Sequence, residues 1–304
     1  PSLPLHFVDF AYWQRDMPNQ HAFDGRVAYW RRALNAPLPF LNIAHRRQGA
    51  KESDATRLEF RVDAVTVAQL RELAGAHRTS MNVVLLTAYA AVLGQESKTA
   101  GMVVQVPIAG RAPETEGLIG CFADALVLRV DTPQTSDFAT WVKGAHRQLY
   151  DGIAQSVPLA LLLKHLELKP ADKLKLPRAV LHWEQTLSLR GTQALAKGGL
   201  ETEPFVVPDD APLQIAPQSQ SVLNLNEDED GNLQGEWLFA KAVVADDVMA
   251  RLVSRFQRLL REVVNPTSTP PMRDAEPPPD TGKAADAGSI LAPFAASDLF
   301  GKPR

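Results

Sequence analysis

The sequence predicts an α/β fold in which a mixed β-sheet is flanked by helices. Two runs of residues that favour strands, Met102–Pro107 and Ala123–Val130, have the composition of β-strands. Residues 81–94 form a helical stretch that is apolar on all sides, so we expect this helix to be buried. A later helix, Asp246–Val264, carries its apolar residues on one face. Strands combined with one buried and one amphipathic helix indicate a fold in which helices pack against a sheet.

The first 36 residues are predicted to form a helical entry segment. Their apolar residues recur at helical spacing in two blocks separated by Pro18-Asn19, and the second block ends before Pro37. The residues that carry this spacing are Leu5, Val8, Tyr12, Phe23, Val27, Tyr29, Trp30 and Leu34. Residues 37–55 show no period and include the basic patch His45-Arg46-Arg47, which predicts a long solvated loop.

A strand followed by two helices is predicted next. Apolar and charged residues alternate over 58–62, which is typical of a half-buried strand, and Asp63 is placed to cap the helix that follows. Ser80 is predicted to cap the apolar helix over 81–94, and Gly94 sits where a C-terminal cap belongs.

The second half continues the α/β pattern. We expect a helix over Phe138–Tyr150, a short helix over 158–167, a strand over 178–183 and an irregular stretch to about residue 212. A hairpin follows, with strands Ser221–Asn226 and Leu233–Phe239. The acidic run 227–230 lacks the ligand spacing of a calcium loop, so it is interpreted as the solvated turn, with Asp230-Gly231-Asn232 at its tip.

Composition excludes several classes of protein. The 304 residues carry a formal net charge of −3 with both signs scattered, which argues against nucleic acid or an anionic membrane as a partner. One cysteine permits neither an intrachain disulfide nor a cysteine-based metal site. The longest apolar run, Val83–Leu93, is too short to cross a bilayer. No stretch near the start of the sequence resembles a signal peptide. A cytoplasmic protein is expected, and Pro1 in place of Met indicates a piece of a longer chain.

No catalytic constellation is evident in the sequence. Motifs for a serine nucleophile, a zinc site or a phosphate loop are missing, and the seven histidines are dispersed. His146, His165 and His182 are interpreted as structural residues on helices and a strand. Cys121 is interpreted as a small buried thiol, because no basic residue adjoins it to lower its pKa.

Three stretches, in this order, resemble the C-terminal half of a nonribosomal peptide synthetase condensation domain. Phe7–Arg15 (FVDFAYWQR) resembles the family's Y-x-D-Y-A-x-W-Q, and Val106–Arg111 (VPIAGR) matches its x-P-x-A-G-R. Glu116–Arg129 (EGLIGCFADALVLR) matches E-x-x-I-G-x-F-V-N-T-L-x-x-R, and Gln155–Leu159 resembles a degraded Q-D-x-P-F. The resemblance covers residues 1–264, which we take as the C-terminal lobe, and leaves 265–304 as a Pro-rich linker and tail.

The resemblance implies one lobe of a chloramphenicol-acetyltransferase-like, two-lobed fold. It also implies an acyltransferase that joins a carrier-bound acyl or peptidyl thioester to an amine or hydroxyl acceptor. The implied partners are an acyl or peptidyl carrier protein with its phosphopantetheine arm, the N-terminal lobe and adjacent synthase modules. Neither a directly bound cofactor nor a metal is implied.

The same resemblance singles out residues for the substrate channel or the lobe interface: Gly110, Arg111, Gly120, Phe122 and Asp124. The two glycines allow a close backbone approach, either in a tight turn or where a pantetheine arm passes. Arg111 is suited to hold a carboxylate across a lobe boundary. Asp9, Trp13 and Arg129 belong to the scaffold of the motifs, and core packing is the favoured interpretation of Trp13.

The sequence also departs from the family pattern. The catalytic signature HHxxxDG belongs to the N-terminal lobe, and this sequence has no HH dipeptide, so no catalytic residue is assigned. The family's N-T is replaced by Asp124-Ala125, Q-D-x-P-F has changed at Ser156 and Leu159, and S-R-x-P-L is missing around 178–185. A lobe without its partner should expose an apolar patch, or cover that patch by self-association or with the tail.

Two alternatives therefore stay open. One is a non-catalytic docking module that recruits carrier or partner proteins, for example through the apolar tip of its tail. That tip consists of Ile290, Leu291, Phe294, Leu299 and Phe300. The other is an acyltransferase of the same superfamily that uses acyl-CoA, and it ranks last because the sequence lacks D-F-G-W-G.

Overall fold

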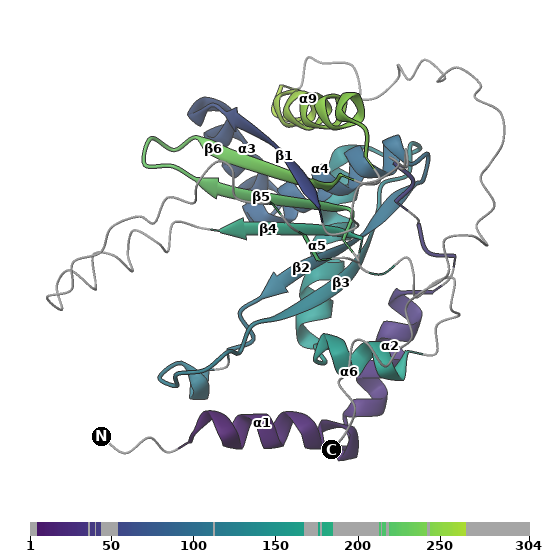
Figure 1. Cartoon of the computed structure of the whole chain (residues 1–304), viewed down its shortest axis with the longest axis vertical. Helices are drawn as coiled ribbons and strands as arrows, with labels where there is room; N and C mark the ends of the chain where they lie inside the picture. The colour runs from purple at the N-terminus through teal and green to yellow at the C-terminus, as the bar shows by residue number, and fades with distance from the viewer. Residues whose placement is uncertain are drawn as a thin grey trace, which may run out of the picture. The chain divides into compact units, whose positions relative to one another are not determined.

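The chain was analysed as a computed structural model (Figure 1). It describes residues 5–35, 37–39, 41–43, 54–111, 113–166, 176, 178–184, 213, 215–216, 219–241 and 244–265. The basic patch 45–47 and the apolar tip of the tail lie outside these residues, as does most of the stretch expected to be irregular. All of the described residues belong to one compact unit, Pro1–Pro271.

A six-stranded mixed sheet forms the centre of this unit, with strand order β1-β6-β5-β4-β2-β3. Its strands are β1 (Ala55–Val62), β2 (Gly101–Ile108), β3 (Asp124–Asp131), β4 (Ala179–Glu184), β5 (Ser221–Glu227) and β6 (Leu233–Ala240). Strand β4 pairs in parallel with β2 and β5, whereas the other three pairings are antiparallel. The mixed sheet predicted from the sequence is confirmed.

The helices also occur in the predicted order. They are α1 (Phe7–Asp16), α2 (Phe23–Ala33), α3 (Ala64–Ala76), α4 (Met81–Glu96), α5 (Phe138–Ala154), α6 (Leu159–His165) and α9 (Asp246–Val263). Two short 3₁₀ helices, η1 (Met17–Asn19) and η2 (Pro113–Thr115), lie between them. None of the helices in the described segments has the length and apolarity needed to cross a bilayer.

Helix α4 lies at the centre of the helical layer. It contacts β2, α3, α5 and α9 (Figure 1). Its residues from Val83 to Gly94 are all buried. The sheet face that packs against α4 is also apolar. The strand register aligns Leu128, Val104 and Ala179 in one row across β3, β2 and β4, and this row continues through β5 and β6. The all-round apolar composition of residues 81–94 therefore reflects contacts on every side of the helix.

The helix caps show where the sequence-based predictions hold and where they fail. Asp63 caps α3 as predicted, since its carboxylate accepts from the Thr66 amide at 2.9 Å. Ser80 is the N-cap residue of α4, but its side chain makes no capping hydrogen bond. Gly94 is not a C-terminal cap: the helix continues to Glu96, and a Cβ on Gly94 would lie 3.1 Å from the carbonyl oxygen of Gly101. Glycine is needed there for close packing, which the sequence pattern did not distinguish from capping.

Helix α3 ends on a residue in the left-handed conformation. Arg78 has φ 51°, and the Thr79 amide donates back to Ala74 O at 2.9 Å, which is the hydrogen-bond pattern of a Schellman motif. Glycine is favoured at this position because a side chain is strained there by about 1 kcal/mol.

We therefore expect Arg78→Gly to stabilise the protein by about 1 kcal/mol, which corresponds to roughly 2–4 °C in Tm. Thermal unfolding followed by circular dichroism measures this gain. Arg78→Ala is the control, because alanine keeps the Cβ that causes the strain. Equal Tm values for the glycine and alanine variants would contradict the assignment of strain to this residue.

The β5–β6 turn confirms the interpretation of the acidic run. Asp228 accepts hydrogen bonds from the Asn232 amide at 2.8 Å and from Gln234 Nε2 at 2.8 Å, and Gly231 has φ 81°. Although partial burial alone would raise it, these hydrogen bonds and the charge of Arg61 lower the pKa of Asp228 to about 2. The run thus holds a turn together.

Candidate functional site

The β2–β3 connection, residues 109–123, carries four of the five residues proposed for the channel or lobe interface. Arg111 organises it from within: its Nη1 donates to Thr115 O at 3.0 Å and to Leu118 O at 2.9 Å, and its Nη2 donates to Gly120 O at 3.2 Å. The guanidinium also lies 4.4 Å from the centre of the Phe122 ring. In the described part of the chain, Arg111 therefore binds carbonyl oxygens, and its expected carboxylate partner stays a prediction.

The two glycines of this connection serve close packing in different ways. Gly110 has φ 62°, and a Cβ there would lie 2.0 Å from Phe122 O, so only glycine fits without moving the backbone. A Cβ on Gly120 would lie 2.2 Å from the ring of Phe7 in α1. Gly110 brings the two arms of the connection together, and Gly120 makes room for α1.

Aromatic side chains join α1 to the connection. The ring centroid of Phe122 lies 5.1 Å from that of Phe7 and 4.7 Å from that of Phe10. The ring centroid of Phe10 in turn lies 5.8 Å from that of Trp13. Asp9 has a local role, because it accepts from the His6 amide at 2.8 Å and so caps α1. The first and third family motifs, about 100 residues apart in the sequence, therefore pack against each other.

Much of the surface of α1 is nevertheless exposed. No residue of the helix is buried, and Trp13 is 49% exposed, so the expectation that Trp13 packs in the core is wrong. Val8 and Tyr12 on α1 are 55% and 69% exposed, and Ile119 on the β2–β3 connection is 95% exposed. We call these four side chains, Val8, Tyr12, Trp13 and Ile119, the apolar surface. The contiguous apolar patch expected for a lobe without its partner stays a prediction.

Asp124 begins β3, and one of its oxygens makes two backbone contacts. Its Oδ1 accepts from the Ala125 amide at 2.8 Å and from the Leu159 amide at the start of α6 at 3.1 Å. Burial raises the pKa of this half-buried carboxyl, and the two backbone hydrogen bonds oppose that rise. Arg129, at the other end of β3, donates to Asn35 O at 2.9 Å and to Asp131 at 3.0 Å, which is a structural role.

The raised pKa of Asp124 makes a prediction about stability. The folded state holds this proton more tightly than the unfolded state, so the contribution of the group is favourable at low pH and is lost as pH rises through its folded-state pKa. Asparagine, the residue of the family motif, can accept the same two hydrogen bonds without a charge. We expect Asp124→Asn to raise Tm at pH 7 by about 1–2 °C, with a smaller gain near pH 4.

Asp137 provides a control of the opposite sign. Hydrogen bonds from the side chain and backbone of Thr140 lower the pKa of Asp137. Asp137→Asn should therefore lower Tm at pH 7, with the loss shrinking as pH falls. Thermal unfolding across this pH range measures both variants. A lower Tm for Asp124→Asn at pH 7 would show that a cation balances the Asp124 charge.

No nucleophile paired with a base is found among the described residues. Cys121 is exposed, so the expectation of a buried thiol is wrong. His146 bonds Thr79, His165 packs edge-on against Phe23, and burial lowers the pKa of half-buried His182. No group of three His, Cys, Asp or Glu residues in the described segments could hold a metal ion.

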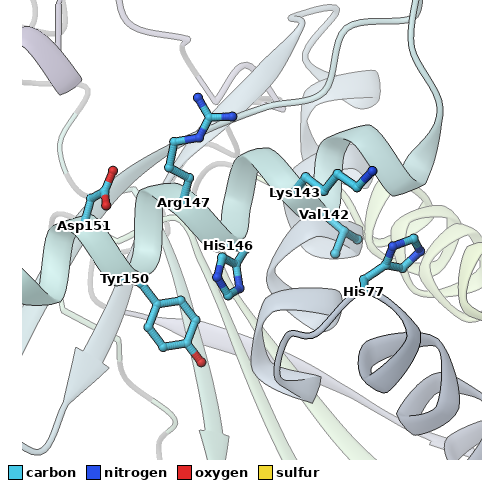
Figure 2. A pocket seen from close by; sticks show the side chains of 7 residues that line it. All are labelled: His77, Val142, Lys143, His146, Arg147, Tyr150 and Asp151. Carbon is cyan, nitrogen blue, oxygen red and sulfur yellow. The ribbon is translucent and has the colours of Figure 1, made fainter.

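Two hollows lie away from the β2–β3 connection. The first, of about 390 Å³, is lined by His77, Val142, Lys143, His146, Arg147, Tyr150 and Asp151 (Figure 2). The second, of about 450 Å³, lies between α2 and the end of α5 and includes Arg26, Tyr29 and Arg32. Burial, followed by the charge of Asp151, raises the pKa of Tyr29. Neither hollow can be predicted from the sequence, because the residues that line it are distributed over helix faces without any motif.

Comparison with known proteins agrees with the resemblance. Residues 1–284 match the family described as the condensation domain. Tyrocidine synthase 3 of Brevibacillus parabrevis is 33% identical over 274 residues, which are 88% of this chain and 4% of that protein. A linear gramicidin synthase of the same species is 25% identical over 86% of this chain and 5% of its own length. The chain thus spans about one twentieth of the length of these relatives.

Solved structures share the fold. The X-domain from teicoplanin biosynthesis superposes with a TM-score of 0.68 at 18% identity, covering 89% of this chain and 62% of that chain. An X-domain has also been solved in complex with OxyB, and it gives the same TM-score. The cyclization-docking bidomain of EpoB from Sorangium cellulosum gives 0.65 at 17% identity, covering 87% and 53%.

Proposed function

The chain belongs to the condensation-domain family of nonribosomal peptide synthetases, and we propose that it is the C-terminal, acceptor-side part of such a domain. In this proposal an N-terminal lobe with the HHxxxDG signature lies on the same polypeptide or on a partner chain. The two lobes together join a carrier-bound acyl or peptidyl thioester to an amine or hydroxyl acceptor. The lobe described here supplies one wall of the channel and one docking face for a carrier protein.

The observation that carries this proposal is the structure formed by the family motifs. Arg111 binds three carbonyl oxygens of the β2–β3 connection, and Phe122 of that connection packs on the rings of α1. A connection held in one conformation can position a substrate arm precisely, because its groups need no reordering on binding. The general base of the reaction is supplied by the other lobe in this proposal.

The apolar surface gives the N-terminal lobe a place to bind. Its four side chains are between 49% and 95% exposed, although water disfavours exposed apolar groups of this size. This chain covers only 62% of the solved X-domain from teicoplanin biosynthesis, so that X-domain contains a further region that this chain does not match. We therefore propose that the N-terminal lobe, and no unrelated partner, covers the apolar surface.

Complementation tests the proposal. The full chain is mixed with a cognate N-terminal lobe, a carrier loaded with the donor and a carrier loaded with the acceptor, and the condensed product is measured by mass spectrometry. We expect product only when both lobes are present. No product, together with no binding to either carrier or to the lobe, would overturn the proposal.

Two variants of equal exposure locate the contact. Tyr12 on α1 and Val65 on α3 are both 69% exposed, so aspartate at either position should leave the isolated fold intact. Tyr12→Asp should weaken binding of the N-terminal lobe about tenfold or more, whereas Val65→Asp should not. Equal binding by the two variants would show that the lobe binds elsewhere.

A second candidate is a recruiting module without condensation activity. The solved X-domain in complex with OxyB is a fold relative bound to another protein, and Asp124-Ala125 replaces the family's N-T in this chain. The double variant Asp124→Asn/Ala125→Thr discriminates between the candidates in the complementation assay. Product formed by this variant and not by the natural sequence would favour recruitment, and equal product from both would favour catalysis.

A further inference from the structure

We propose that the hollow between α5 and the end of α3 binds a phosphate monoester or free phosphate. It lies outside the β2–β3 connection, and its lining contains none of the residues that match a family motif. Two side-chain cations and two imidazoles, Lys143, Arg147, His77 and His146, surround a space of about 390 Å³. This combination of charge and N–H donors suits the oxygens of a phosphoryl group.

The spacing on α5 explains why the cations gather on one side. Lys143 and Arg147 are four residues apart, so they lie on one face of the helix about 6 Å apart along its axis. His146 and Tyr150 form the neighbouring row by the same rule. Figure 2 shows Lys143 extending toward His77, the C-cap residue of α3, so residues far apart in the sequence contribute to the site. Neither Lys143 nor Arg147 lies within salt-bridge distance of a carboxylate in the described segments, although the charge of Lys143 helps to lower the pKa of Asp137.

Contacts on both sides hold His146 in place. Its Nδ1 lies 2.8 Å from Thr79 Oγ1, and its ring centroid lies 4.4 Å from that of Tyr150. When the Thr79 hydroxyl donates to Nδ1, the neutral ring carries its proton on Nε2. Nε2 is then a donor with no hydrogen-bond partner in the described residues. A fixed donor binds an anion with a smaller loss of side-chain entropy than a free one.

Two features of the hollow could oppose anion binding: carbonyl oxygens at the end of α3 and the negative charge of Asp151. Hydrogen bonds within the chain occupy the first, and distance weakens the second. The end of α3 would present carbonyl oxygens, but Leu73 O, Ala74 O and Gly75 O accept from the amides of residues 77–79, at 3.1, 2.9 and 2.9 Å. Asp151 carries a negative charge, but it lies at the opposite end of the hollow from His77 (Figure 2). The phosphoryl group is therefore placed at the end formed by His77, Lys143 and His146.

The experiment titrates the full chain with inorganic phosphate at constant ionic strength, with the ring signals of His77 and His146 followed by NMR. We expect saturable shifts in the millimolar range. The double variant Lys143→Gln/Arg147→Gln should weaken binding about tenfold or more, and His146→Gln provides a second, independent variant. Lys241→Gln/Arg261→Gln removes two exposed cations outside the hollow and should bind phosphate like the natural chain.

Three outcomes would overturn the proposal: no saturable shift up to about 20 mM phosphate, equal binding by the natural chain and the Lys143/Arg147 variant, or equal shifts with chloride at the same ionic strength. Adenosine monophosphate and pantetheine 4′-phosphate then identify the source of the ligand. Tighter binding of pantetheine 4′-phosphate than of inorganic phosphate supports the site and assigns it to a carrier arm. Equal affinities support the site as one for phosphate alone.

Discussion

Replacement of Trp237 by alanine is expected to cost about 3–5 kcal/mol of stability, the range for a large aromatic residue deleted from a core. Trp237 is fully buried, and its ring centroid lies 5.4 Å from that of Tyr89 and 5.8 Å from that of Phe256. It thus links β6 to the two helices α4 and α9. Deleting it leaves a cavity at the point where the sheet meets both helices.

A buried hydrogen-bond network adds to this loss. Trp237 Nε1 donates to Ser221 Oγ at 2.7 Å, and the Tyr89 hydroxyl lies 2.9 Å from the same oxygen. Burial raises the pKa of Tyr89, so its hydroxyl stays protonated at neutral pH. Trp237→Phe separates the two effects, because it keeps most of the packing and removes one hydrogen bond, at a cost of about 1–2 kcal/mol.

Trp13→Ala is the matched control, since it removes the same side chain at a position that is 49% exposed. Chemical unfolding should show a loss of about 1 kcal/mol or less for Trp13→Ala. For Trp237→Ala, the expected loss of 3–5 kcal/mol corresponds to a fall of roughly 6–20 °C in Tm. Equal losses in the two alanine variants would contradict the burial of Trp237.

The fold was accessible from the sequence because its strongest signals are local. Helix α9 has an apolar stripe, the strands β2 and β3 are short runs of mostly apolar residues that include several valines, and Asp63 precedes its helix as an N-cap residue does. Strand order was not accessible, because the parallel pairing of β4 with β2 and β5 joins segments far apart in the sequence. No local pattern encodes such a pairing.

The candidate site shows the same division. Motif resemblance identified Gly110, Arg111 and Phe122, but it did not indicate that Arg111 binds the carbonyl oxygens of its own connection. Trp13 was misjudged because composition predicts that tryptophan is mostly buried, whereas exposure depends on which partner covers it. The hollow on α5 was missed because residue 77 reaches it only through the packing of α3 against its neighbours.

Replacement of Gly110 by alanine is the second large effect that we expect. The residue has φ 62°, and the added Cβ would lie 2.0 Å from Phe122 O, so alanine is strained by its conformation and by a backbone clash. We expect a loss of about 1–3 kcal/mol. Because the clash is with backbone, relief requires the two arms of the β2–β3 connection to separate. The contacts of Arg111 with its three carbonyl oxygens then weaken together.

Gly117→Ala is the control within the same connection, since nothing lies within 4 Å of its added Cβ. It should change stability by no more than about 0.5 kcal/mol. Hydrogen exchange gives the decisive measurement: amides from residue 114 to residue 122 should exchange faster in Gly110→Ala and at the natural rate in Gly117→Ala. Unchanged exchange in both would mean that Arg111 holds the connection without the close approach at Gly110. A faster rate combined with lost complementation would link the conformation of this connection to condensation.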